Sequence, residues 1–188
     1  MCFSLKLPFI VCLTGMPGSG KTTVAHAIEG MGFYYISLGD VVREETVSRG
    51  LEVNDRNCGF VMKDLREKFG PHAVAQLSLK NFPKDKHLVV VDGIRSIYEV
   101  QVYRSIGRTR LLAIHASPDR RYNFLVSRRR ADAPLSREDF DLRDRRELEV
   151  GVGDAIALSD EIISNNSTLE ALIRKVKNQI RLWLEEEV

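Results

Sequence analysis

Short, continuous apolar runs alternate along the chain with longer stretches whose apolar positions recur at helical spacing. Continuous apolar runs are typical of strands buried on both faces, and their alternation with helices predicts an α/β fold with a parallel sheet. The third run is fully apolar, which predicts a central strand. The five expected strands cover Phe9 to Leu13, Phe33 to Ser37, Leu88 to Val91, Leu111 to Ile114 and Glu161 to Ser164.

Helical patterns fill the segments between these strands. The first helix should end near Gly30 and Gly32, and residues 40–86 form a polar, mostly helical stretch. The final helix starts at the capping sequence Ser167-Thr-Leu-Glu170 and has one apolar face, which favours core packing over a partner surface. The apolar face of the first helix consists of Val24, Ala27, Ile28 and Met31, and that of the final helix of Leu169, Leu172, Ile173, Val176, Ile180 and Trp183.

The segment directly after the first strand, Gly15-Met-Pro-Gly-Ser-Gly-Lys-Thr22, matches the phosphate-binding pattern G-x-x-x-x-G-K-[ST]. Its glycines let backbone N–H groups point at a phosphate, and the following helix N-terminus and Lys21 add positive charge. Thr22 is the expected Mg²⁺ ligand, so the expected cofactors are ATP and Mg²⁺. The predicted nucleotide-binding residues are Gly15, Met16, Pro17, Gly18, Ser19, Gly20, Lys21, Thr22 and Thr23.

Asp92 ends the most apolar run of the chain. A carboxylate at the carboxyl end of a parallel strand faces the crevice in which α/β sheets bind ligands, so Asp92 is the second predicted metal ligand. The alternative is a turn aspartate before Gly93, a common pair in turns.

Between Arg120 and Arg146 the chain has nine arginines, five acids and no lysine. Arginine suits bidentate recognition of phosphate oxygens, and two arginine-bearing helical arms flank the polar connection 131–136. The segment 120–147 could therefore be a short lid whose cations stabilise the transferred phosphoryl group. A solvated helix with i, i+4 ion pairs is the alternative. The arginines expected to act in catalysis with Lys21 are Arg128, Arg130, Arg143 and Arg145.

Length and composition limit the remaining possibilities. The 188 residues are expected to form one compact domain, and a net charge of +2 gives no global argument for binding nucleic acid or a membrane. The three cysteines lack the spacing of a zinc site and are interpreted as thiols in a reducing compartment. The apolar N-terminal segment has no basic region or cleavage site, which favours a strand over a signal peptide. The expected location is cytoplasmic.

Four segments together resemble the adenylate kinase and nucleoside monophosphate kinase group of P-loop enzymes. They are the loop at 15–22, Ile36-Ser-Leu-Gly-Asp-Val-Val-Arg43, Val91-Asp-Gly-Ile-Arg95 and the arginine-rich arms. The strongest resemblance is to an archaeal group of adenylate kinase-related P-loop proteins. Those proteins share the sequence Asp-Gly-aliphatic-Arg-Ser, an Arg-Asp-Arg triplet, here at 143–145, and Gly-x-Gly-acid, here at 151–154.

The resemblance implies a three-layer P-loop sandwich with strand order 2-3-1-4-5, an acceptor-binding insertion at about 40–86 and a short lid. It implies that Arg43 and Arg95 bind the phosphate of an acceptor, with Asp40 and Glu99 also at the substrate. Leu38, Ile94 and Glu99 depart from the family's threonine, Phe-Pro and glutamine. Since an ionised glutamate only accepts hydrogen bonds, Glu99 suits a base edge that presents N–H groups, or it only completes a helix cap with Ser96.

The function that this pattern favours is Mg·ATP-dependent phosphoryl transfer to a small phosphate-bearing acceptor, a nucleotide or a coenzyme precursor such as dephospho-coenzyme A. The altered acceptor positions leave open an ATP-dependent conformational switch, or slow ATPase, that acts on a protein or RNA partner. RNA as the phosphorylated substrate is a weaker interpretation, because few aromatic side chains for base stacking accompany the lid arginines.

Overall fold

The structure is a computed structural model that describes residues 7–127 and 134–186. Five parallel strands form one sheet in the order β2-β3-β1-β4-β5, as the resemblance implied. The fully apolar third strand lies next to the central strand β1. The strand bounds are β1 Phe9–Thr14, β2 Tyr34–Ser37, β3 Leu88–Ile94, β4 Arg108–His115 and β5 Glu161–Ser164.

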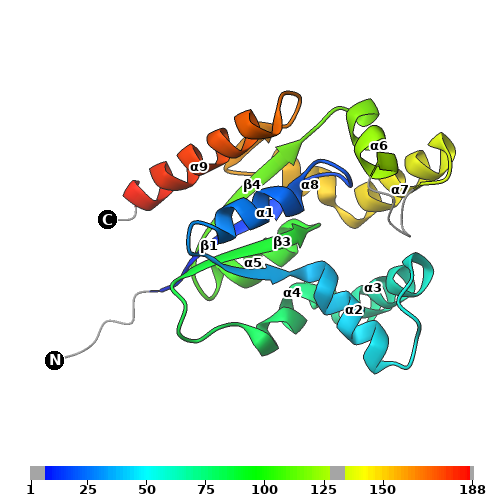
Figure 1. Cartoon of the computed structure of the whole chain (residues 1–188). Coiled ribbons are helices and arrows are strands. Elements are labelled where there is room, and N and C mark those ends of the chain that lie inside the picture. Colours follow the sequence, from blue (N-terminus) through cyan, green and yellow to red (C-terminus); the bar gives the residue numbers. More distant parts are fainter. Residues whose placement is uncertain (1–6, 128–133, 187–188) are drawn as a thin grey trace.

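Helices cover both faces of the sheet, which gives the expected three layers (Figure 1). Adjacent β1 residues face opposite sides: Ile10 and Cys12 pack with α2 to α5, whereas Val11 and Leu13 pack with α1 and α9. The helix bounds are α1 Lys21–Glu29, α2 Leu38–Ser48, α3 Asp55–Phe69, α4 Ala73–Ser78, η1 Leu79–Asn81, α5 Ile97–Arg104, α6 Pro118–Ser127, α7 Arg137–Val150, α8 Val152–Ala157 and α9 Leu169–Glu186.

The predicted apolar faces are mostly confirmed. In α1 the buried alanine is Ala25 and not Ala27, which is only half-buried. In α9 Leu172, Val176, Ile180 and Trp183 are buried, but Leu169, in the first position of the helix, is 53% exposed. The final helix therefore packs on the sheet face, as its spacing predicted.

A bulge shapes the end of β3. Leu13 of β1 pairs with Asp92, and the next residue, Thr14, pairs with Ile94, so Gly93 is the extra residue. Its φ of 100° lies in the left-handed region that favours glycine. The strand thus extends beyond the predicted Val91, so that Asp92 meets Thr22 of the phosphate-binding loop and Arg95 follows directly after the strand end.

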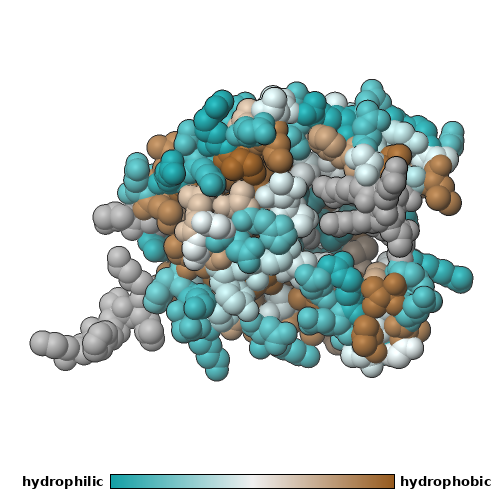
Figure 2. All heavy atoms as spheres, in the orientation of Figure 1, coloured by the Kyte–Doolittle hydropathy of each residue, from teal (hydrophilic) through white to brown (hydrophobic). Residues whose placement is uncertain are grey.

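The pairs α2–α3 and α6–α7 both lie beyond the carboxyl ends of the strands (Figure 1). The stretch 40–86 forms most of α2 together with α3, α4 and η1, and the segment 120–147 contains most of α6 and α7. Exposed apolar side chains of α2, α3 and their connection, Val47, Val53 and Phe60, contribute to a region where Figure 2 shows an apolar patch. Within the described part of the chain, every helix is too short or too polar to cross a membrane.

Candidate active site at the phosphate-binding loop

The phosphate-binding loop joins β1 to α1 and depends on close backbone approach. Gly15 has φ of 142°, and a Cβ there would lie 2.2 Å from the carbonyl oxygen of Ile114 in β4. The loop residues from Gly15 to Gly20 are buried, except for the half-buried Met16. Glycine is therefore required at residue 15 both by its backbone conformation and by the adjacent strand.

Lys21, the first residue of α1, folds back over the loop. Its Nζ donates hydrogen bonds to the carbonyl oxygens of Gly15 at 2.7 Å and Met16 at 3.1 Å. Burial lowers the pKa of Lys21 to about 8; Asp92 and Glu147 partly oppose this shift, while Arg95 and Arg143 add to it. The ammonium group thus lies among four ionic side chains, with only neutral acceptors in direct contact.

Thr22, in the first turn of α1, and Asp92, near the end of β3, are in direct contact. Thr22 Oγ1 donates to Asp92 Oδ2 at 2.8 Å, while the buried Oδ1 atom of Asp92 has no partner among the described residues. An unpartnered buried carboxylate oxygen beside a hydroxyl is a suitable oxygen donor set for Mg²⁺, which takes few protein ligands and completes its shell with phosphate oxygens and water. The described residues contain no cluster of three or more histidine, cysteine or acidic ligands.

Two side chains that the sequence did not single out support the loop. Asn165, after β5, donates through Nδ2 to the carbonyl oxygen of Ser19 at 2.9 Å. Arg121 of α6 is 4% exposed; it donates to the carbonyl oxygen of Pro17 at 3.2 Å and to both oxygens of Asp144 in α7 at 2.8 and 2.5 Å. Arg121 therefore connects the loop to both helices of the predicted lid.

The arginines predicted to bind an acceptor are paired with carboxylates. Arg95 Nε donates to Glu147 Oε2 at 2.6 Å, and a second nitrogen lies 3.3 Å from Oε1. Arg43 pairs with Asp40 one turn earlier in α2, where Ser37 caps the helix by accepting from the Asp40 N–H. Glu147 has no sequence signal of its own, because it lies in a helix rich in both charges.

Glu99 is a correction to the sequence interpretation. Its side chain is fully buried, accepting from Arg66 of α3 at 2.8 Å and from the backbone N–H of Arg95 at 2.7 Å. Both oxygens are therefore used within the protein, and in this arrangement none is open to a substrate base. The cap alternative holds in part: Ser96 Oγ accepts from the Glu99 N–H, but the carboxylate bonds to Arg95 and not to Ser96.

The lid arginines separate by position. Arg143 is half-buried and close enough to Lys21 to lower its pKa, whereas Arg145 is exposed. Residues two apart point to nearly opposite sides of a helix, so of these two arginines Arg143 faces the loop. Arg128 and Arg130 lie outside the described residues. Thr23, the residue after the loop motif, is half-buried in the first turn of α1.

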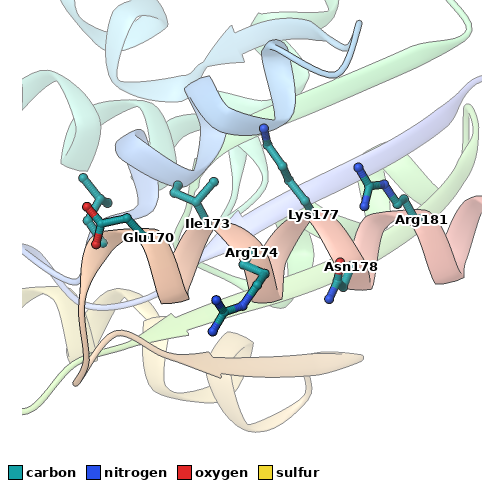
Figure 3. Close-up of a pocket in the computed structure, with 7 residues that line it drawn as sticks. Glu170, Ile173, Arg174, Lys177, Asn178 and Arg181 are labelled. Carbon is teal, nitrogen blue, oxygen red and sulfur yellow. The ribbon is translucent and has the colours of Figure 1, made fainter.

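An open depression of about 500 Å³ lies elsewhere, along α9 (Figure 3). Lys177 and Arg181 point to one side of the helix, and Arg174 and Asn178 to the other. All of its lining residues belong to α9, and none is a predicted site residue. The phosphate-binding loop and the strand end beside it remain the candidate site, because the oxygen donors and charged side chains described above meet there.

Known proteins agree with this description. A family model described as an AAA domain matches residues 14–141. A UPF0200 protein of Thermococcus gammatolerans is 41% identical over 177 residues, which are 91% of this chain and 93% of that protein. A UPF0200 protein of Methanocaldococcus jannaschii is also 41% identical, over 172 residues, 90% of this chain and 87% of that protein.

Solved structures show the same fold at low sequence identity. TT1252 from Thermus thermophilus has a TM-score of 0.62 at 23% identity and covers 94% of this chain and 98% of its own. Shikimate kinase from Acinetobacter baumannii, in complex with shikimate, has a TM-score of 0.59 at 19% sequence identity, and the match covers 97% of this chain and 96% of that chain. A gluconokinase from Sinorhizobium meliloti has a TM-score of 0.53 at 16% sequence identity, and the match covers 96% of this chain and 98% of that chain. The chain belongs to the UPF0200 family of archaeal proteins, with a P-loop kinase-like fold.

Proposed function

We propose that the protein transfers a phosphoryl group from Mg·ATP to a small phosphate-bearing acceptor, a nucleotide or a coenzyme precursor such as dephospho-coenzyme A. One observation carries this proposal: the end of β3 places Asp92 against Thr22 of the loop and is followed directly by Arg95, whose charge acts on Lys21. A simple ATPase needs the first group but has no need of the second.

The donor side would bind ATP through the loop backbone and Lys21. On binding, the Lys21 ammonium would exchange the carbonyl oxygens of Gly15 and Met16 for β- and γ-phosphate oxygens. Thr22 and Asp92 would hold Mg²⁺, which supplies neutralising charge to the phosphates when bound. The loop connections through Asn165 and Arg121 would keep the N–H groups oriented, so that little reorganisation accompanies the reaction.

The acceptor side would use Arg43 and Arg95 to hold the acceptor's phosphate, with Asp40 as a neighbouring hydrogen-bond acceptor. Residues 40–86 would form the acceptor-binding insertion and 120–147 the lid. Arg143, with Arg128, Arg130 and Arg145 after lid closure, would stabilise charge on the transferred group. Since positioning and charge neutralisation supply most of the rate enhancement in phosphoryl transfer, this scheme requires no strong general base.

The direct test is ADP formation from Mg·ATP by the purified protein with each nucleoside monophosphate, with dephospho-coenzyme A, and without acceptor. We expect turnover that depends on one acceptor and disappears in Lys21→Ala. Turnover that Lys21→Ala retains would argue against the loop mechanism, and hydrolysis indifferent to every small acceptor would argue against a kinase.

An ATP-dependent switch is the second candidate. It is favoured by the pairing of Arg43 with Asp40 and of Arg95 with Glu147, because paired arginines could serve to hold helices in one arrangement. Under this alternative, hydrolysis would be slow, independent of small acceptors and stimulated by a protein or RNA partner. The same turnover assay, repeated with archaeal cell extract and with total RNA, separates the two candidates.

A further inference from the structure

The arginine proposed to bind the acceptor, Arg95, forms an ion pair with Glu147 of the lid helix α7. Arg95 and Glu147 are joined by two contacts of 2.6 and 3.3 Å, and their side chains are only 28% and 12% exposed. These are the guanidinium nitrogens that a phosphate would use in the same forked geometry. The acceptor's phosphate and Glu147 thus compete for one binding face.

Two further contacts along α7 support the ion pair between Arg95 and Glu147. At its C-terminal end, Gly151 adopts φ of 109°, and a Cβ there would lie 3.7 Å from the Arg95 carbonyl oxygen and from Ser96 Cβ. Toward its middle, Asp144 is held by the buried Arg121. Asp144 and Glu147 are one turn apart and therefore lie on the same face of α7. Through these two carboxylates α7 is connected to the donor loop, by way of Arg121, and to Arg95.

Charge explains why this arrangement would be stable until an acceptor arrives. Burial acts to raise the pKa of Glu147, but Arg95, followed by Lys21 and Arg143, outweighs it and holds the pKa below its usual value. The side chain is therefore ionised at neutral pH. A phosphate placed against Arg95 would meet this negative charge at contact distance, and the two anions would repel each other.

We propose that the Glu147 carboxylate is an internal anion that binds Arg95 where the acceptor's phosphate would bind. The phosphate displaces this carboxylate, so acceptor binding releases the C-terminal end of α7. This proposal rests on the proposed function, since it concerns the same arginine. Because α7 also carries Arg143, its release changes the charge around Lys21. Acceptor binding is thereby connected to the donor side, and the ion pair between Arg95 and Glu147 keeps α7 in the position described here as long as no acceptor is bound.

The test uses inorganic phosphate as the probe and the Arg95 Nε–H resonance as the reporter, in the full-length protein labelled with ¹⁵N and ¹³C. The donor loop is kept filled with Mg·ADP, so that phosphate is not measured there, and Arg95→Lys identifies the resonance. In the wild-type protein, phosphate should shift this resonance and also the ¹³C resonance of the Glu147 carboxylate. In Glu147→Gln, the dissociation constant for phosphate should fall about tenfold or more.

The matched control is Glu149→Gln, which removes the same charge from an exposed position on the same helix. We expect it to change the dissociation constant less than twofold. Equal affinities in Glu147→Gln and the wild type would overturn the exchange, and so would a Glu147 resonance that stays unchanged while the Arg95 resonance shifts. If Glu147→Gln does not fold, the two wild-type resonances still decide the question.

The outcome is separable from that of the proposed function. Exchange at Arg95 without acceptor-dependent turnover would support the role of Glu147 as an internal anion and contradict the proposed kinase activity. Acceptor-dependent turnover without exchange would keep the kinase and remove the internal anion.

Discussion

The proposed donor and acceptor sides of the site differ in how their charges are satisfied. On the donor side, Lys21 contacts only neutral carbonyl oxygens and Asp92 Oδ1 has no partner among the described residues. On the acceptor side, Arg43 and Arg95 each contact a carboxylate of the protein. A ligand of the loop replaces weak contacts, whereas an acceptor must replace ion pairs. Under the proposed function, acceptor binding would therefore require more rearrangement than ATP binding.

The largest expected effect is on the donor side. Lys21→Ala should reduce phosphoryl transfer at least about 10³-fold, ~4 kcal/mol, because it removes the charge placed at the transferring phosphates. Far-ultraviolet circular dichroism should remain unchanged, since the hydrogen bonds of Lys21 stay within the loop. Lys175→Ala, at an exposed position of α9, is the control. A loss of activity in both variants would show that the effect is not specific to the loop.

A change at the connection between the two sides should lower stability. Arg121→Met leaves the half-buried Asp144 without its bidentate partner and removes a bond to the loop, so the free energy of unfolding should fall by about 3 kcal/mol. Urea denaturation measures it, with Arg181→Met on the surface of α9 as the control. A fall below ~1 kcal/mol would mean that α6, α7 and the loop are not held together by this arginine.

On the acceptor side, Arg95→Ala should raise the KM for the acceptor about 10- to 100-fold and the KM for ATP less than about 3-fold. The physical reason is that Arg95 would contact the acceptor's phosphate but only adds long-range charge at Lys21. Steady-state kinetics with each substrate varied in turn provide the measurement. Equal rises in both KM values would contradict the division into donor and acceptor sides.

The smallest expected effect is a pH dependence of ATP binding. In the empty protein Lys21 has a pKa of about 8, and bound phosphates should raise it. Below pH 8 the lysine is charged before and after binding, so affinity is constant. Above pH 8 binding takes up a proton, so affinity should fall by up to about tenfold per pH unit.

Calorimetry at pH 7 and pH 9 in buffers of different ionisation enthalpy would detect that proton. Lys21→Met should bind ATP more weakly at pH 7 and should show no proton uptake at pH 9. Uptake that persists in Lys21→Met would assign the titration to another group.

The sequence predicted the placement of the loop and of Asp92 well, because these residues are local in the chain or follow directly from strand order. The loop motif is contiguous, and two neighbouring parallel strands necessarily bring the end of β3 next to the loop. The five strands and their order are confirmed, while the ends of β3 and β4 extend beyond the apolar runs because backbone pairing continues through polar residues.

The long-range ion pairs could not be obtained in this way. The ion pairs Arg66–Glu99, Arg95–Glu147 and Arg121–Asp144 join residues 33, 52 and 23 positions apart. In a chain with 28 basic and 26 acidic residues, charge alone does not select the partners. Glu99 shows the consequence, since its place in the motif suggested a substrate contact and packing made it a buried partner of Arg66.

The sequence by itself therefore determined the phosphate-binding loop, the layered parallel fold and the position of Asp92, because short-range patterns and strand topology specify them. Only the tertiary structure decided which carboxylate meets which arginine, and with it that Glu147 covers Arg95. Those contacts depend on how α3, α5 and α7 pack over the strand ends, and helix packing depends on the shape of buried surfaces that no local pattern encodes.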